Sequence, residues 1–327
     1  MDHHRTAPAH PGRTRPGGVL VVGSITADVT TFSDRLPARG ETVLGDDLTL
    51  VLGGKGANQA LASALAGADT VMAGCVGSDL FQELTLGSMT AHGIDTSRVR
   101  VVDGPTGVAH IRVDASGEND IVMVPLANDH LSLQDVDDAV TATSGRASVL
   151  LTQLEIPREI AAHAITRGHE AGMTVVLDPA PAAVLPAHLW PAVDVVTPNE
   201  TEARVITGID VHDADSAIEA GRWFVERGAA NAVITLAAAG AVLVDRASSV
   251  HVAAAPVDAV DTTAAGDAFA GYLGADLARG LDVASALQRA MAAGALAVTR
   301  RGASPSLPAA TEVEQLLTTR QGREADA

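Results

Sequence analysis

The chain has 327 residues, of which 47% are hydrophobic and 19% are charged, and its formal net charge is −18. This composition excludes a disordered or fibrous protein, and no apolar run reaches the length of about 18 residues that a membrane span requires. The acidic charge and the few aromatic residues (2 Trp, 1 Tyr and 4 Phe) also argue against nucleic acid as a partner.

The first residues of the chain, 1–17, are expected to form a disordered tail. They contain no apolar segment of the kind found in secretory signals, so we expect a cytoplasmic protein. Three histidines of this tail match no zinc-binding pattern, namely His3, His4 and His10. Cys75 is the only cysteine, which excludes an intrachain disulfide and fits a reducing compartment. Its place at the end of an apolar run favours a core residue over a nucleophile.

Short apolar runs alternate with segments of helical spacing along most of the chain. The runs are typical of buried strands and cover residues 18–23, 70–74, 148–154, 173–178, 193–197 and 231–236. The apolar spacing of helices is found in the intervening segments 57–65, 79–92 and 157–171. Such alternation predicts parallel strands joined by right-handed crossovers. We therefore expect an α/β fold, a three-layer sandwich with a mostly parallel central sheet flanked by helices.

Two segments interrupt this alternation and are expected to form a small β-sheet lid outside the main sheet. Residues 28–50 have no helical period. Residues 107–125 contain two alternating runs, 107–113 and 119–124, which are typical of a hairpin. Added strands of this kind commonly act as a lid or as an interface.

The last third of the chain returns to helical spacing. Helices are expected at residues 264–279, 283–298 and 311–317. One domain would then span residues 18–319, followed by a short C-terminal tail at 320–327.

Residues 260–269, VDTTAAGDAF, place an acidic residue at a predicted helix N-terminus. Phe269 begins an apolar i, i+4, i+8 series, so residues 264–267 form the first turn, where backbone N–H groups lack partners inside the helix. Small side chains let an anion reach these groups, and the helix dipole favours negative charge there. Asp267 beside such an anion suits a general base better than a pure binding site. Alternatively, Asp267 only complements the helix dipole.

A glycine-rich segment, GGKGANQ at residues 53–59, contains Lys55, the only lysine of the chain. Its glycines allow a ligand to contact the main chain. The segment matches neither the Walker A pattern nor the dinucleotide fingerprint. Lys55 and Asn58 can donate hydrogen bonds to hydroxyl groups or to phosphate. The alternative is an ordinary glycine turn before a helix.

Two polar residues follow a predicted strand in the segment TPNETE at 197–202. Asn199 and Glu202 are one helical turn apart, at the edge where open α/β sheets bind ligands. They can hold a magnesium-bound water or a phosphate. Simple capping of the next helix explains the same spacing equally well.

Other strand ends also carry polar residues or glycine. Thr235 lies near the end of the run at 231–236, and Gly240 follows five residues later. Asp28 comes just after the first strand, and Glu155 follows the run at 148–154. Two carboxylates at strand ends suit the recognition of a polyol, because each accepts hydrogen bonds from hydroxyl groups.

In this order, the motifs resemble those of the ribokinase/PfkB family of carbohydrate kinases. The resemblance covers about residues 18–317 and is carried by VVGSITADV, PARGETVLG, GGKGANQALA, TQLE, LDPAPA, TPNETEA, DTTAAGDAF and AVTRRGASPS. It implies transfer of the γ-phosphoryl group of ATP to the 5-hydroxyl of ribose. It also implies a homodimer whose contact is formed by the lid strands.

The resemblance implies roles for individual residues. Asp267 matches the catalytic base, and the anion hole beside it matches Ala264, Ala265 and Gly266. The positions that bind the sugar match Thr26, Asp28, Gly53, Gly54, Lys55, Asn58, Glu155 and Asp267. The positions that bind the nucleotide match Asn199, Thr235, Ala237, Gly240, Gly266 and Met291. Glu202 would organise Mg²⁺ through water, and a K⁺ site would involve Asp261, Thr263, Ala297, Arg300, Gly302 and Ser306.

Three positions depart from the family pattern. Thr26 stands where members usually have an Asn that contacts a sugar hydroxyl, so the choice of pentose is open. Met291 replaces a frequent His or Asn near adenine, and residues 237–239 replace a more polar stretch near the phosphates. A kinase for deoxyribose, a hexose or a nucleoside is therefore an alternative, as is a non-catalytic sugar or nucleotide sensor. A dinucleotide-dependent dehydrogenase is disfavoured, because no fingerprint follows the first strand.

Overall fold

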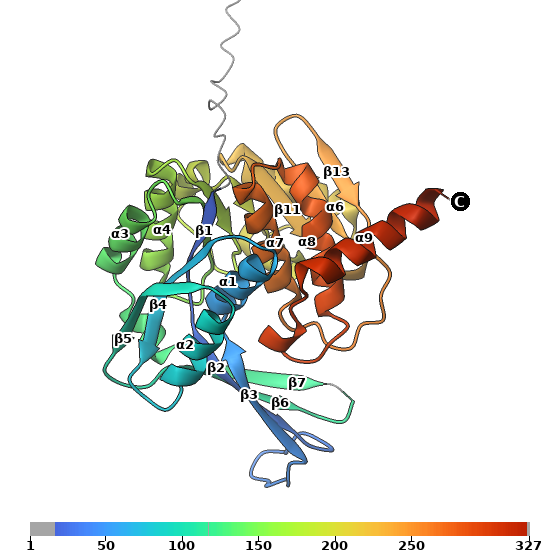
Figure 1. The fold of residues 1–327 in the computed structure, drawn as a ribbon. Helices are drawn as coiled ribbons and strands as arrows, with labels where there is room; N and C mark the ends of the chain where they lie inside the picture. Colours follow the sequence, from blue (N-terminus) through green and yellow to red (C-terminus); the bar gives the residue numbers. More distant parts are fainter. Residues whose placement is uncertain (1–16, 117, 326–327) are drawn as a thin grey trace, which may run out of the picture.

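A computed structural model describes residues 17–116 and 118–325 of the chain (Figure 1). The expected disordered tail, apart from Gly17, lies outside the described residues. Within the described part, no helix combines the length and the apolar character needed to cross a membrane.

The main sheet of the described chain has nine strands in the order β13-β12-β11-β10-β9-β8-β1-β4-β5. From β11 to β5 all neighbouring strands are parallel, and only the two pairs made by β12 are antiparallel. The mostly parallel sheet predicted from the sequence is confirmed. The strands are β1 Gly18–Val22, β4 Thr70–Gly77, β5 Asp95–Val102, β8 Ala147–Thr152, β9 Thr174–Leu177, β10 Val195–Val196, β11 Asn231–Thr235, β12 Ala241–Val244 and β13 Ser249–Val252.

Helices cover both faces of this sheet, as Figure 1 shows. Their bounds are α1 Lys55–Leu65, α2 Gln82–Ala91, α3 Leu133–Ala142, α4 Arg158–Glu170, α5 Glu200–Thr207, α6 Ala214–Glu226, α7 Ala265–Ala278, α8 Val283–Ala297 and α9 Ala310–Ala325. Successive residues of β1 point to opposite faces, so Val19 and Val21 join the core under α1, α7 and α8. Leu20 and Val22 join the core under α3, α4 and α6. The sequence prediction of a three-layer sandwich is confirmed.

A second, four-stranded sheet forms the lid and projects from the sandwich (Figure 1). Its strand order is β3-β2-β6-β7, with bounds β2 Thr26–Phe32, β3 Asp47–Gly53, β6 Gly107–Val113 and β7 Asn119–Val124. The hairpin predicted at 107–113 and 119–124 is confirmed. Asn128 joins the lid to the sandwich, because its side chain bonds both the N–H and the carbonyl oxygen of Ile25, which lies between β1 and β2.

Some boundaries differ from the sequence-based expectation. Strand β5 had not been expected, because it is an edge strand with mostly exposed or half-buried residues. The helix expected at 311–317 covers Ala310–Ala325, so residues 320–325, expected as a tail, are helical. Helix α1 begins at Lys55 rather than at residue 57, since Gly54 already adopts the cap conformation with φ 86°.

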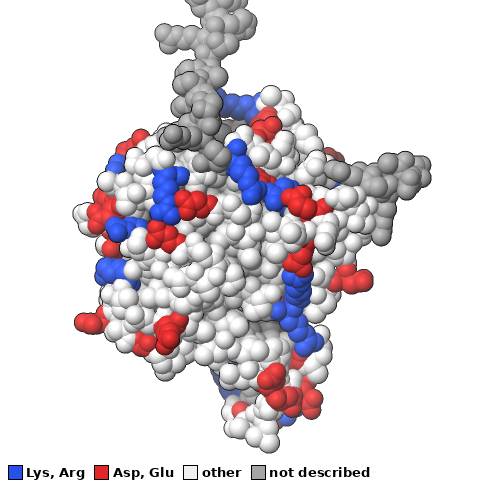
Figure 2. All heavy atoms as spheres, in the orientation of Figure 1, with Lys and Arg blue, Asp and Glu red and all other residues white. Residues whose placement is uncertain are grey.

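The carboxyl ends of β1, β8 and β9 lie beside the first turns of α1 and α7. Helix α7 packs against α1, β1 and β8. On the face drawn in Figure 2, Lys and Arg side chains of the described residues lie next to Asp and Glu, with large uncharged areas between them. The fold thus brings polar strand ends and two helix N-termini to one place.

Candidate active site

Six charged side chains from distant parts of the chain interact electrostatically at these strand ends. We call them the carboxylate cluster, and its members are Asp28, Lys55, Glu155, Asp178, Glu202 and Asp267. Lys55 Nζ lies 3.5 Å from Asp178 Oδ2 and 3.9 Å from Asp267 Oδ1. Because the cluster contains one ammonium group and five carboxyl groups, it favours cations and needs added positive charge before it can accept a phosphate.

Asp267 lies in the first turn of α7 and is only 4% exposed. Its Oδ2 accepts a hydrogen bond of 3.0 Å from Asn58 Nδ2, and its Oδ1 accepts one of 3.2 Å from Gln59 Nε2. Both donors come from α1, so packing of α1 on α7 fixes the orientation of the carboxylate. Asn58 Oδ1 is buried and has no hydrogen-bond partner among the described residues. One acceptor beside Asp267 therefore has no partner within the described chain.

The N-terminus of α7 presents backbone N–H groups without a side-chain cap. Ala264 is the N-cap residue in a left-handed conformation with φ 58°, and Ala265 N donates to Thr262 O. Within the described chain, the N–H of Gly266 has no hydrogen-bond acceptor, and a Cβ placed at Gly266 would meet no atom within 4 Å. Open space in front of an unpaired N–H at a helix N-terminus is suited to an anion.

Glu155 connects the glycine-rich segment to the end of β8. Its Oε2 accepts hydrogen bonds from Lys55 N (2.9 Å) and from Ser24 Oγ (2.7 Å). The carboxylate therefore accepts a hydrogen bond from the first N–H group of α1, which has no partner inside the helix. Gly54 precedes this helix with φ 86°, a conformation that favours glycine.

Asp28 points from the lid toward the glycine-rich segment. Its Oδ1 accepts a hydrogen bond of 2.7 Å from Thr26 Oγ1. A Cβ at Gly53 would lie 2.0 Å from Asp28 Cγ, so glycine is required there for the carboxylate to fit. The sequence suggested that Gly53 leaves room for a ligand. The structure shows that the space beside Gly53 is occupied by the Asp28 carboxylate.

Burial and neighbouring charges shift several pKa values in the cluster. Burial raises the pKa of Asp28 to about 6, against the lowering effect of the Thr26 hydrogen bond. Burial also raises the pKa of Asp178, although Lys55 acts in the opposite direction. For Lys55 the burial would lower the pKa, but the carboxylates of Asp178 and Asp267 outweigh it and raise the pKa above its usual value. Lys55 is therefore charged at neutral pH.

Asn199 and Glu202 form a capping box at the start of α5. Asn199 Oδ1 accepts from Glu202 N (2.9 Å), and Glu202 Oε2 accepts from Asn199 N (2.9 Å). Burial raises the pKa of Glu202, and the Asn199 N–H partly counteracts this. The capping alternative drawn from the sequence is confirmed, and Glu202 also interacts electrostatically with Lys55.

The predicted nucleotide positions are spread over β11, the turn that follows it, the N-cap of α5, and the helices α7 and α8. Thr235 ends β11 and forms an isolated bridge with Asn199. Ala237 and Gly240 bound a short 3₁₀ turn, with φ 45° and φ 107°, before β12. Met291 is half-buried on α8 and packs against the core under α7. The structure brings Thr235 and Asn199 together, whereas Met291 lies on a separate element, α8.

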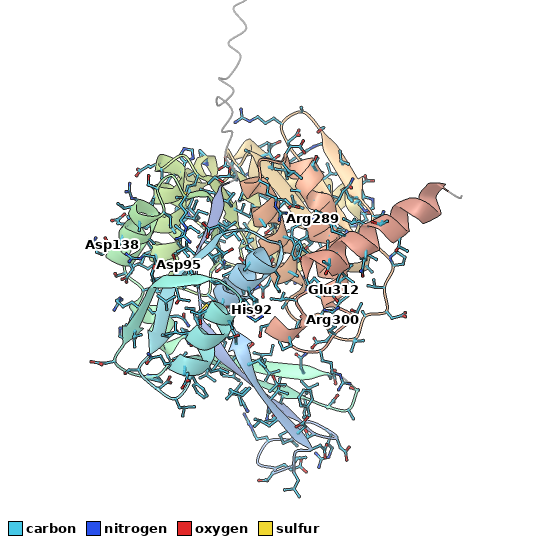
Figure 3. The ribbon with its side chains drawn as sticks, in the orientation of Figure 1. His92, Asp95, Asp138, Arg289, Arg300 and Glu312 are labelled. Carbon is cyan, nitrogen blue, oxygen red and sulfur yellow. The ribbon has the colours of Figure 1, made fainter. Side chains whose placement is uncertain are left out.

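The residues of the predicted K⁺ site lie in the loop before α7, at the end of α8 and in the segment after α8, and hydrogen bonds hold these parts together. Asp261 Oδ1 accepts from Thr263 N and Oγ1, and Asp261 Oδ2 accepts from Gly302 N. Ser306 Oγ donates to the carbonyl oxygen of Ala303, and the N–H of Arg300 donates to that of Ala297. The side chain of Arg300 pairs instead with Glu312 of α9 (Figure 3).

Sequence reasoning missed three side chains of the site. Asp178, Gln59 and Gln153 are buried and connected: Gln153 Nε2 donates to Gln59 Oε1, and Gln59 Nε2 donates to Asp178 Oδ2 over 2.8 Å. Asp178 and Gln59 belong to the motifs LDPAPA and GGKGANQALA, and Gln153 belongs to TQLE. A polar residue at or near the end of an apolar run was the signal available for Asp178 and Gln153.

Comparison with known proteins gives concordant matches over most of the chain. The model of the pfkB family of carbohydrate kinases matches residues 17–310. A ribokinase of Haemophilus influenzae is 38% identical over 300 residues (91% of this chain, 98% of the relative). A deoxyribokinase of Salmonella typhi is 35% identical over 301 residues (91% and 98%). The structure of an Arabidopsis thaliana ribokinase complexed with ribose and ATP has a TM-score of 0.83 at 30% identity, covering 93% of this chain and 99% of that one.

Proposed function

Because this chain belongs to the pfkB family of carbohydrate kinases, we propose that it transfers the γ-phosphoryl group of ATP to the 5-hydroxyl of D-ribose. The observation that carries the proposal is the buried carboxylate of Asp267 in the first turn of α7, beside the exposed N–H of Gly266. The ribokinase relatives support ribose as the sugar, and the Arabidopsis complex supports ATP as the phosphoryl donor.

Asp267 acts as the general base of the proposed reaction. Its carboxylate takes the proton of the sugar 5-hydroxyl while that oxygen bonds to the γ-phosphorus of ATP, and the bond from this phosphorus to the oxygen of ADP breaks. The hydrogen bonds from Asn58 and Gln59 hold both carboxylate oxygens. The N–H groups at the start of α7 stabilise the negative charge on the transferred phosphoryl group, as does the ammonium group of Lys55.

The donor set of the carboxylate cluster fits a magnesium ion held largely through water and phosphate oxygens. No group of three or more His, Cys, Asp or Glu side chains in the described residues is arranged to bind a metal directly. Glu202 would hold Mg²⁺ through water, with one oxygen still bonded to the Asn199 N–H. When bound, Mg²⁺ supplies positive charge to the phosphates of ATP.

The Asp261 loops fit a monovalent cation such as K⁺. The carboxylate of Asp261 fixes the loop that leads into α7 to the loop at Gly302, and the N–H groups of Val260 and Asp261 both donate to Val298 O. A cation between these loops would order the N-terminus of α7 without touching the substrate. We propose that Asp261, Thr263, Ala297, Arg300, Gly302 and Ser306 contribute to it, Arg300 through its backbone because its guanidinium pairs with Glu312.

The sugar is proposed to bind between the lid and the glycine-rich segment. Asn58 has an unpartnered Oδ1, and Asp28 and Glu155 offer carboxylate oxygens to hydroxyl groups. Deoxyribose is the second candidate, because the Thr26 hydroxyl already donates its hydrogen bond to Asp28. A deoxyribokinase is also among the relatives. A hydroxyl that already donates to Asp28 has no hydrogen left for a sugar hydroxyl, whereas a free side-chain amide can donate two hydrogen bonds.

We also propose a homodimer formed through the lid, and a cytoplasmic location where ATP is available. One face of the lid sheet carries four apolar side chains that are 39–61% exposed, namely Leu48, Leu50, Val122 and Val124. The strand pairing places them on the face opposite Asp28. They come from the two edge strands, β3 and β7, and exposed apolar side chains on one face of a sheet are typical of an interface.

The proposed function is tested by identifying the product formed from ATP and single sugars. Ribose, 2-deoxyribose, fructose and adenosine are each incubated with the enzyme, Mg²⁺ and either K⁺ or a tetramethylammonium salt. We expect ribose 5-phosphate, identified by mass spectrometry and phosphorus NMR, and faster turnover with K⁺. Phosphorylation of deoxyribose with a higher kcat/KM than ribose would select the second candidate. ATP hydrolysis without any sugar phosphate would contradict both.

A further inference from the structure

Asp178 is a buried carboxylate for which the proposed reaction has no use. It follows strand β9 and is 6% exposed. Its Oδ2 accepts a hydrogen bond of 2.8 Å from Gln59 Nε2 and lies 3.5 Å from Lys55 Nζ. The same two groups also approach Asp267 Oδ1, Gln59 Nε2 at 3.2 Å and Lys55 Nζ at 3.9 Å. In both cases the group is nearer to Asp178 than to the base.

The amide of Gln59 is fixed at its other end as well. Gln59 is fully buried on α1, and its Oε1 accepts a hydrogen bond from Gln153 Nε2. This bond directs the NH₂ group of Gln59 toward the two carboxylates. A chain of hydrogen bonds therefore runs from the end of β8 through α1 to Asp178 and Asp267.

We propose that Asp178 is a positioning residue, which holds the ammonium group of Lys55 and the amide of Gln59 so that Asp267 stays oriented and free to accept a proton. The inference rests on the proposed function, because it requires Asp267 to act as the base. The physical reason is competition for the one ammonium group. Lys55 lies nearer to Asp178 (3.5 Å) than to Asp267 (3.9 Å), and a closer pairing with Asp267 would stabilise its charged carboxylate further and weaken it as a proton acceptor.

Kinetics with ribose separate positioning from a purely structural role. In Asp178→Ala, we expect kcat to fall by about 100-fold, the scale of a small misplacement of reacting groups. The KM for ribose should stay within about twofold, because Asp178 is not proposed to touch the sugar. Asp178→Asn keeps an oxygen acceptor for both Gln59 and Lys55, so its kcat should recover to within about fivefold of wild type.

A matched control is Asp194→Ala, at the start of the neighbouring strand. Asp194 Oδ2 accepts the N–H of Val175, at the amino ends of the strands and away from the cluster. We expect this variant to keep wild-type kcat even where its melting temperature falls. An equal loss of kcat in both alanine variants would mean that the effect is structural and would overturn the proposal.

A second readout does not depend on activity. Since Lys55 is the only lysine, labelling with ¹³Cε-lysine gives one NMR signal, which reports on its ammonium group. We expect the Lys55 signal to move on Asp178→Ala and to stay near the wild-type position in Asp178→Asn. An unmoved signal in Asp178→Ala would overturn the proposal, whether or not the enzyme is active. Failure of the wild-type enzyme to phosphorylate any sugar would separately refute the proposed function.

Gln59→Leu covers the case in which Asp178→Ala does not fold. This variant keeps Asp178 and Lys55 but removes the shared amide donor. We expect kcat to fall by about 10-fold or more with the ribose KM within about twofold. Unchanged kcat in Gln59→Leu, or a kcat for Asp178→Asn as low as that of an enzyme without Asp267, would contradict the proposal.

Discussion

At the scale of single residues, Asp28 is a proposed sugar-binding group whose buried carboxylate lowers the stability of the fold at neutral pH. Burial raises its pKa from 3.8 to about 6. Between about pH 4 and pH 6 the folded state therefore binds more protons than the unfolded state. The stability that the neutral carboxyl group provides is fully present below this window and is lost as the pH rises through it.

We predict that Asp28→Asn removes this loss, since Asn stays neutral and can still accept the Thr26 hydroxyl. The free energy of unfolding of Asp28→Asn minus that of wild type should increase by on the order of 2 kcal/mol between about pH 4 and about pH 8. One pKa unit corresponds to about 1.4 kcal/mol. Urea unfolding at both pH values measures this. A variant with the same stability difference from wild type at both values would contradict the assignment of the raised pKa.

The sequence predicted some of the site residues but not how they are connected. Lys55, Asn58 and Asp267 were predicted separately from two motifs, and the structure places them in one cluster. Asp178 and Gln59 were not predicted. Their partners are up to 208 residues away in the chain, and such contacts follow from tertiary packing rather than from local spacing. The magnesium, potassium and nucleotide roles stay predictions.

At the scale of elements, the N-terminus of α7 leaves the backbone N–H group of Gly266 accessible, at a cost in helix stability. Gly266 lies in the first helical turn with open space in front of it. Glycine is less favourable than alanine in a helix by about 1 kcal/mol. The absence of a side chain there is explained if a phosphoryl group must approach the backbone.

We predict that Gly266→Ala raises the free energy of unfolding by about 0.5–1 kcal/mol and lowers kcat, because the new methyl group occupies the space proposed for phosphate. Gly87→Ala is the matched control, since Gly87 lies in α2 and a Cβ there also meets nothing within 4 Å. It should show the same stabilisation with unchanged kcat. If Gly266→Ala keeps full kcat, the proposed anion hole is not at this N-terminus.

The elements that the sequence predicted best are those with a buried face. The run at 18–23 and the helix at 264–279 correspond closely to β1 and α7. Strand β5 was missed because it lies at the edge of the sheet, where side chains are exposed and apolar patterning is weak. Strand β10 has only two residues, so its length could not be read from the longer apolar run at 193–197.

At the scale of the whole molecule, the three-layer arrangement follows from alternating strands and helices, whereas the position of the lid does not. The lid is joined to the sandwich through residues such as Ile25 and Asn128, which are 103 positions apart. No sequence pattern fixes that contact. The exposed apolar face of the lid, on Leu48, Leu50, Val122 and Val124, is likewise a property of the folded sheet.

We predict that Leu50→Glu converts a dimer into a monomer, because it places a charge in the proposed apolar interface. Sedimentation velocity measures the oligomeric state. The control is Val205→Glu, since Val205 is 49% exposed on α5, outside the lid. A wild-type protein that sediments as a monomer, or a Leu50→Glu variant that remains a dimer, would refute dimerisation through the lid.

The account as a whole depends on proton removal by Asp267, and Asp267→Asn tests it most directly. The amide keeps the size of the side chain but cannot act as a base. In coupled ATP turnover with ribose, we predict that kcat falls by about 10²–10⁴-fold, the usual contribution of general-base catalysis, while calorimetry shows that ribose still binds. If the variant retains more than about a tenth of the wild-type kcat, Asp267 is not the general base.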